Sequence, residues 1–188
     1  MSDTTPSAAV ADVIRQRRTI ENFRADRPPH EVILQAIELA CWAPNHKHTE
    51  PWRFHLLGPE SSAQLIALNT RLVREKKGDE AAQKKQQRWS QIPGWLVMTC
   101  VLSEDPLRSE EDYAACCCAA QNLSLALWSL GIGVKWSTGE VTRSEGFAQL
   151  LGLTPGTRKI VGLFAYGYPQ TIPQSRRRPV AEVIEEYP

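Results

Sequence analysis

Three consecutive side chains near the N-terminus, those of Arg17, Arg18 and Thr19, place two guanidinium groups beside a hydroxyl. This trio could bind a phosphate group, because a guanidinium makes paired, charge-assisted hydrogen bonds to phosphate oxygens. The doublet also ends a stretch, residues 7–17, whose apolar residues recur at helical spacing. Cations at the C-terminal end of a helix are favoured by its dipole. On these residues alone, a stabilised helix end is the simpler interpretation.

Two further groups could do chemistry, but ordinary contacts explain both better. His46, His48 and Cys41 are metal-ligand types, yet no second cluster at ligand spacing supplies a fourth donor, so no metal site is expected. Three consecutive cysteines at 116–118 lack the cationic neighbours that favour a reactive thiolate. We expect them to pack as small residues between helices. The chain has no GxxxxGK[ST] phosphate loop and no GxSxG elbow, and Gly-Ile-Gly at 131–133 is too short for a dinucleotide fingerprint.

Apolar periodicity predicts the elements that position these residues. Helices are expected over 7–17, 30–43, 59–77, 110–130 and 142–151, and strands over 51–57, 95–102, 134–137 and 159–166. The last helix would open on a capping box that runs from Thr142 to Glu145. Residues 71–89 hold seven basic and three acidic residues. A solvated, variable segment explains them better than an anion-binding patch does.

The chain has 188 residues, enough for one domain with a buried core. Its formal net charge of +1 removes the footprint of a general nucleic-acid binder, and its 42% hydrophobic content excludes a disordered chain. Five cysteines, an odd number, fit a reducing compartment, and residues 1–14 show no signal-peptide pattern, so we expect a cytoplasmic protein. The uncharged stretch 113–134 contains Gln121, Asn122, Ser124 and Ser129, which favours a buried helix over a membrane span.

Separated motifs occur in one order along most of the chain. The motif IRQRRT at 14–19 is followed by NFR at 22–24, APNHKHTEPWRF at 43–54, GIG at 131–133, WSTG at 136–139 and GYP at 167–169. In this order and spacing, from about residue 10 to 184, the chain resembles the FMN-dependent nitroreductase family, in its compact branch of NAD(P)H nitroreductases.

This resemblance implies one domain over 1–188, of the α+β class. The fold would be a three-layer α/β/α sandwich around a central mixed, mainly antiparallel sheet, in an intertwined homodimer. Residues 71–92 would form a variable helical excursion, and the tail at 170–188 would pack on the partner subunit. The small-residue helix at 113–130 and the apolar tail residues fit a homodimer independently, because obligate interfaces resemble a core cut in half.

The resemblance also implies an FMN cofactor at the subunit interface and NAD(P)H as co-substrate. The flavin N5 would carry the hydride, so no protein residue is expected to be catalytic. Nitroaromatic, quinone or similar acceptors would be reduced by a ping-pong mechanism. The implied cofactor-binding residues are Arg17, Arg18, Thr19, His46, Glu50, Trp136, Ser137, Thr138, Gly139 and Arg177.

Two positions depart from the family pattern. Glu50 stands where the family usually has Gln, and a carboxylate there would disfavour negative charge on the reduced ring. Ser137 and Thr138 stand where compact relatives carry Arg-Ser, and Arg177 in the tail could replace the lost cation. An FMN-binding carrier or sensor of the same fold, with little turnover, is therefore the alternative function.

Overall fold

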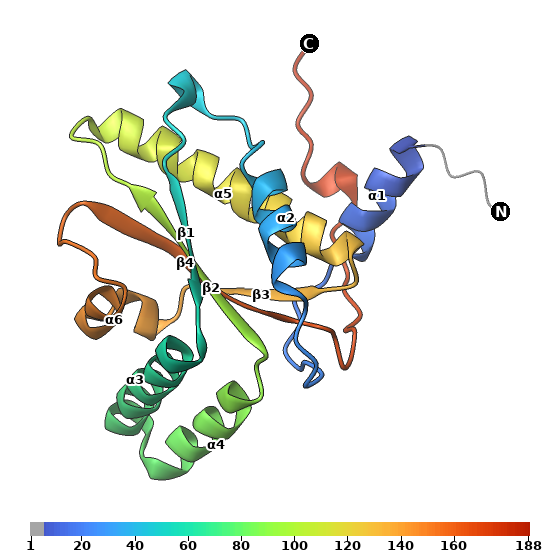
Figure 1. Ribbon diagram of the computed structural model, residues 1–188. Helices are drawn as coiled ribbons and strands as arrows, with labels where there is room; N and C mark the ends of the chain where they lie inside the picture. Colours follow the sequence, from blue (N-terminus) through green and yellow to red (C-terminus); the bar gives the residue numbers. More distant parts are fainter. Residues whose placement is uncertain (1–5) are drawn as a thin grey trace.

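The computed structural model describes residues 6–188 (Figure 1). Its helices are α1 (Pro6–Gln16), α2 (His30–Ala40), α3 (Pro59–Lys77), α4 (Asp79–Ser90), α5 (Pro106–Ser129) and α6 (Glu145–Leu150). Its strands are β1 (Trp52–Leu57), β2 (Gly94–Val101), β3 (Gly133–Ser137) and β4 (Arg158–Gly167). Short 3-10 turns are η1 (His46–His48), η2 (Glu140–Arg143) and η3 (Val180–Glu182). Every strand predicted from periodicity is present.

The four strands form one sheet in the order β1-β2-β4-β3, with every neighbouring pair antiparallel. Within residues 6–188, the parallel component of the expected mixed sheet is an isolated bridge between Thr19 and Val134. Helices α2 and α5 cover one face, and α3, α4 and α6 cover the other (Figure 1). The expected three-layer arrangement is confirmed.

Strand β2 shows how the sheet is buried on both faces. Leu96 and Met98 point into the core formed with α2 and α5, while Trp95 and Val97 point into the core formed with α3, α4 and α6. All four are at most 3% exposed. Because side chains alternate between faces, a strand covered by helices on both sides must be apolar at nearly every position.

The N-terminal cap of α6 differs from the prediction. Ser144 Oγ accepts a hydrogen bond from the backbone N–H of Phe147 at 3.3 Å. Thr142 Oγ1 instead donates to the carbonyl of Gly139 at 2.7 Å, inside η2. The capping box starting at Thr142 was therefore wrong, because a 3-10 turn takes the place of the helix's expected first turn.

Residues 71–92 form a largely exposed helical segment that is anchored to the core at two residues. They contain the end of α3 and all of α4, separated by Gly78, whose positive φ of 82° stops α3. Ala82 and Trp89 on α4 are buried in the core beneath it. The basic side chains of this segment are thus carried by a helix that is anchored to the sheet.

The three consecutive cysteines lie on helix α5 and differ in burial. Cys116 is buried against the sheet, Cys117 is half-buried and Cys118 is exposed, and all five cysteines of the chain are free thiols. Among residues 6–188, no helix is long and apolar enough to cross a membrane. The C-terminal tail runs back to the side of the molecule that carries α1 (Figure 1).

Candidate functional site at the end of strand β3

The first cavity of interest lies where the segment after α1 passes β3. It encloses about 400 Å³ and is lined by Arg17, Thr19, Gln121, Ser124, Val134, Trp136 and Thr138; we call it the arginine cavity. The backbone N–H of Ile20 donates to the carbonyl of Val134 at 3.1 Å, and Thr19 bridges Val134. These contacts hold Arg17 and Thr19 beside β3, so two separated sequence motifs meet in one cavity.

Arg17 lies in a positively charged environment. Burial lowers the pKa of its guanidinium, and the charges of Arg177 and Arg18 lower it further. Within residues 6–188, no ion pair includes any of these three arginines. An anion would relieve this repulsion, so the arginine cavity suits a phosphate group.

The two adjacent arginines make different contacts. Arg18 Nη1 donates to the carbonyls of Arg15 and Arg17, at 2.6 and 2.9 Å, and so satisfies carbonyls at the end of α1. Arg17 lines the cavity, whereas Arg18 does not. The contacts of Arg18 are those of the helix-end interpretation, whereas the position of Arg17 in the cavity is compatible with an anion site.

Trp136 is fixed as a wall of the arginine cavity. Its indole stacks on Phe164 with ring centroids 5.4 Å apart, and its Nε1 donates to the carbonyl of Val161 at 3.1 Å. The ring passes so close over Gly162 that a Cβ there would clash with it. Glycine at 162 thus permits the orientation of Trp136 that shapes the cavity.

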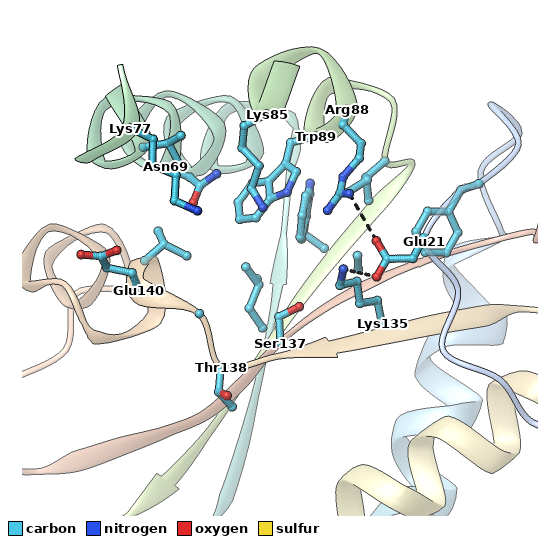
Figure 2. A pocket seen from close by; sticks show the side chains of 18 of the residues that line it. Glu21, Asn69, Lys77, Lys85, Arg88, Trp89, Lys135, Ser137, Thr138 and Glu140 are labelled. Carbon is cyan, nitrogen blue, oxygen red and sulfur yellow. Dashed lines mark hydrogen bonds and ion pairs between the residues drawn. The ribbon is translucent and has the colours of Figure 1, made fainter. Parts of the chain in front are cut away.

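A second cavity, of about 410 Å³, opens on the α3–α4 face of the sheet (Figure 2). We call it the lysine cavity. Trp89 and Trp95 form part of its wall, with ring centroids 4.7 Å apart. Its cationic lining residues are Lys76, Lys77, Lys85, Arg88 and Lys135. An apolar, aromatic interior with a cationic rim suits a planar ligand that has a polar edge.

Charges at one side of the lysine cavity are coupled through Glu21. Its carboxylate accepts a hydrogen bond from Lys135 and lies 3.4 Å from Arg88 Nη1 (Figure 2). The hydrogen bond from Lys135 is the main cause that lowers the pKa of Glu21. Burial lowers the pKa of Lys85, and the charges of Arg88 and Lys135 lower it further. Negative charge on a ligand would be stabilised here.

Two buried donors that line the lysine cavity have no hydrogen-bond partner within residues 6–188. They are Asn69 Nδ2 and Trp95 Nε1. Asn69 directs its amide into the cavity (Figure 2). A buried donor without a partner costs roughly 1–3 kcal/mol. Both atoms are almost wholly inaccessible from the cavity, so a ligand would meet them only if their side chains moved.

The two cavities meet at residues 136–139. Thr138 lines both, and Ser137 and Gly139 line the lysine cavity. The segment therefore separates a group of unpaired arginines from an aromatic cavity rimmed by cations. An elongated ligand with an anionic end and a planar end rich in hydrogen-bond acceptors matches both parts.

Comparisons with known proteins identify the family of this chain. The model of the Nitroreductase family matches residues 14–168. The chain belongs to the nitroreductase family. The Bacillus subtilis protein named "Putative NAD(P)H nitroreductase YfhC" is 33% identical over 175 residues, which cover 91% of this chain and 90% of that protein. The crystal structure of a nitroreductase-like family protein from Bacillus cereus has a TM-score of 0.86 and 31% identity, and the match covers 100% of this chain and 98% of that one.

The nitroreductase motif around His46 and Glu50 lies elsewhere in the chain. It precedes β1, at the opposite edge of the sheet from β3. Thr49 donates to the carboxylate of Asp112 on α5, whereas Ser124 of the same helix lines the arginine cavity. Twelve helical residues separate these two points by about 18 Å. A single chain therefore does not bring His46 and Glu50 to Arg17.

The residues that α3 and α4 contribute to the lysine cavity were not predicted from the sequence. Lys85, Arg88 and Trp89 follow one another at positions i, i+3 and i+4, which lie on one helical face. That spacing was the available signal, but it lay in a segment interpreted as solvated. Asn69 gave no signal, because a lone amide in a polar helix is ordinary. Among the described residues, no three His, Cys, Asp or Glu side chains gather as metal ligands would.

Proposed function

We propose that this chain is an FMN-dependent oxidoreductase that takes hydride from NAD(P)H and reduces nitroaromatic, quinone or similar acceptors by a ping-pong mechanism. One observation carries the proposal. An arginine cluster that makes no ion pair within residues 6–188 and an aromatic cavity lined by cations meet at residues 136–139. FMN combines a phosphate with a planar ring that has a carbonyl-bearing edge.

The residues present fit the cofactor. Arg17 and Thr19, with Arg177 nearby, would hold the phosphate in the arginine cavity. Lys85, Arg88 and Lys135, which line the lysine cavity, would donate to the ring's polar edge. The donor set thus suits both ends of the molecule.

Bound FMN supplies the hydride and electron-transfer chemistry, so the chain needs no acid–base dyad. Lys85, Arg88 and Lys135 would stabilise negative charge at the polar edge, with Glu21 limiting how much positive charge they present. The aromatic wall would exclude water from the ring. Lys135 lies two residues before Ser137, so it supplies a cation near the place where compact relatives carry arginine.

The relatives' names and one solved neighbour support the cofactor and co-substrate. The protein YfhC carries the designation NAD(P)H nitroreductase in its name. A nitroreductase structure from Desulfovibrio desulfuricans is a complex with FMN, at 23% identity and a TM-score of 0.74. For this chain, FMN and NAD(P)H remain part of our proposal.

We also propose a homodimer with FMN at the subunit interface. His46 and Glu50 would then reach the flavin bound by the other chain, which resolves their separation from Arg17 within one chain. The tail at 170–188 would pack on the partner through apolar residues that one chain leaves exposed. Light scattering of the flavin-loaded protein should give the dimer mass, and a monomer with flavin still bound would refute this arrangement.

The first experiment uses the purified, full-length protein. It should be yellow, NADH or NADPH added without oxygen should bleach it, and a nitroaromatic or quinone should restore the colour. Lys84→Gln on the exposed side of α4 is a matched control, which should behave like the wild type. A colourless protein that cannot take up FMN would refute the proposal. A yellow protein that neither nucleotide reduces would favour the carrier or sensor function.

A further inference from the structure

A third cavity, of about 610 Å³, lies beside α6, past the end of β3. Strand β3 stops at Ser137, which pairs with Leu163 of β4. The first residues of β4, from Arg158, therefore extend beyond their neighbour on this side. Segments around η2, α6 and the turn before β4 enclose the space that remains, and we call it the α6 cavity.

The α6 cavity carries excess positive charge. Arg143, Arg158 and Lys159 line it, and no ion pair within the described part of the chain includes them. Glu145 is the acidic lining residue, and its Oε1 already accepts a hydrogen bond from Gln149 at 3.0 Å. Three cations against one carboxylate in a concave site attract anions.

One of these cations is held in place by an aromatic ring. The ammonium of Lys159 lies 4.0 Å from the ring centroid of Tyr113 on α5. This cation–π contact keeps the charge at the wall of the cavity without neutralising it. Thr154, which also lines the cavity, carries a hydroxyl group that can donate to an oxyanion.

The α6 cavity adjoins the site described above. Thr138 lines the arginine cavity, the lysine cavity and the α6 cavity alike. We propose that the α6 cavity binds the anionic group, a phosphate or a carboxylate, of a molecule that exchanges electrons with the flavin. This inference rests on the proposed function and assigns a substrate class to it. Two sources supply such an oxyanion: the 2′-phosphate of NADPH and the carboxylate of an acidic acceptor.

Anaerobic half-reactions of the holoenzyme distinguish the two sources. One arm compares NADPH with NADH as reductants. The other compares 4-nitrobenzoate with its neutral methyl ester as acceptors. The variants Arg143→Gln and Lys159→Gln should each weaken binding of either NADPH or 4-nitrobenzoate about 3- to 10-fold. Binding of the matching compound, NADH or the methyl ester, should stay within about twofold of the wild-type value. Lys84→Gln makes the same change in net charge far from the cavity and should alter neither pair.

A binding measurement that does not depend on turnover completes the experiment. Calorimetry of the oxidised holoenzyme would compare adenosine 2′,5′-bisphosphate with adenosine 5′-phosphate, and 4-nitrobenzoate with its methyl ester. If the variants lose affinity only for the bisphosphate, the bound anion is the 2′-phosphate of NADPH. If they lose affinity only for 4-nitrobenzoate, the bound anion is the carboxylate of an acidic acceptor. If both variants keep wild-type values for every probe while NADH still bleaches the protein, the inference is wrong and the proposed function stands. If NADH and NADPH both fail to bleach the wild type, the proposed function fails instead.

Discussion

Replacing Arg17 by Gln should weaken FMN binding while leaving riboflavin binding almost unchanged. The two flavins differ only in the phosphate, and Arg17 lines the cavity that we assign to it. A hydrogen bond to a charged group contributes about 1.5–3 kcal/mol. Since 1.4 kcal/mol corresponds to a tenfold change in Kd, the loss of FMN affinity lies between about 10- and 150-fold. The lower part of this range is expected, because Arg177 remains near the phosphate and is relieved of a like-charged neighbour.

The assay is a fluorescence titration of the apoprotein with each flavin. Arg18→Gln is the matched control, because it removes the same charge from the adjacent position. Arg18 already donates to the carbonyls of Arg15 and Arg17, so its loss should lower Tm but change FMN affinity by less than about threefold. The reasoning is refuted if Arg17→Gln weakens riboflavin binding as much as FMN binding. It is equally refuted if Arg18→Gln causes the larger loss for FMN.

Three further substitutions follow from the same site. Asn69→Leu removes a buried amide nitrogen that has no partner within residues 6–188, so urea unfolding should show an apoprotein stabilised by up to about 1 kcal/mol; a destabilised apoprotein would contradict this. Gly162→Ala should cost about 1–3 kcal/mol and alter the near-ultraviolet circular dichroism, because its Cβ clashes with Trp136; an unchanged spectrum would count against it. The hydrogen bond from Lys135 lowers the pKa of Glu21 below its usual value near 4.5, so Glu21 stabilises the fold above that pH and the effect disappears as pH falls through the lowered pKa. The unfolding free energies of wild type and Glu21→Gln should therefore differ by less than about 1 kcal/mol at pH 7, since the carboxylate is half-exposed, and should converge once the pH falls below the lowered pKa.

The fold was predictable because its signals are local. The continuous apolar run at 95–102 predicts a strand that is covered on both faces, whichever helices cover it, and β2 is indeed buried on both faces. The different contacts of Arg17 and Arg18 were not predictable from the sequence. The directions of two adjacent side chains at a helix end depend on how the chain turns there. That turn depends on the backbone contact between Ile20 and Val134.

The lysine cavity could not be predicted from the sequence, for a related reason. Periodicity shows that Trp89 and Lys85 share a face of α4, but it does not show whether that face meets the sheet or solvent. The orphaned donor of Trp95 is even less visible, because a tryptophan in a buried strand is explained by packing alone. Long-range placement, and not residue type, makes these groups a site.

The exposed apolar surface of this chain gives the proposed dimer a physical basis. Beside α1 and α5 lies an apolar cavity of about 350 Å³, whose lining residues include Val10 and Ile14, exposed by 61% and 53%. Val180 and Val183 of the tail are 67% and 65% exposed, and the tail runs along the same side as α1 (Figure 1). A second copy of the chain would cover these groups and, by the same contact, bring its His46 and Glu50 to each arginine cavity. Cofactor binding and dimerisation would then be a single linked equilibrium: a flavin that touches both chains stabilises the dimer by its own binding free energy, so removing FMN must weaken the dimer as much as separating the chains weakens FMN binding.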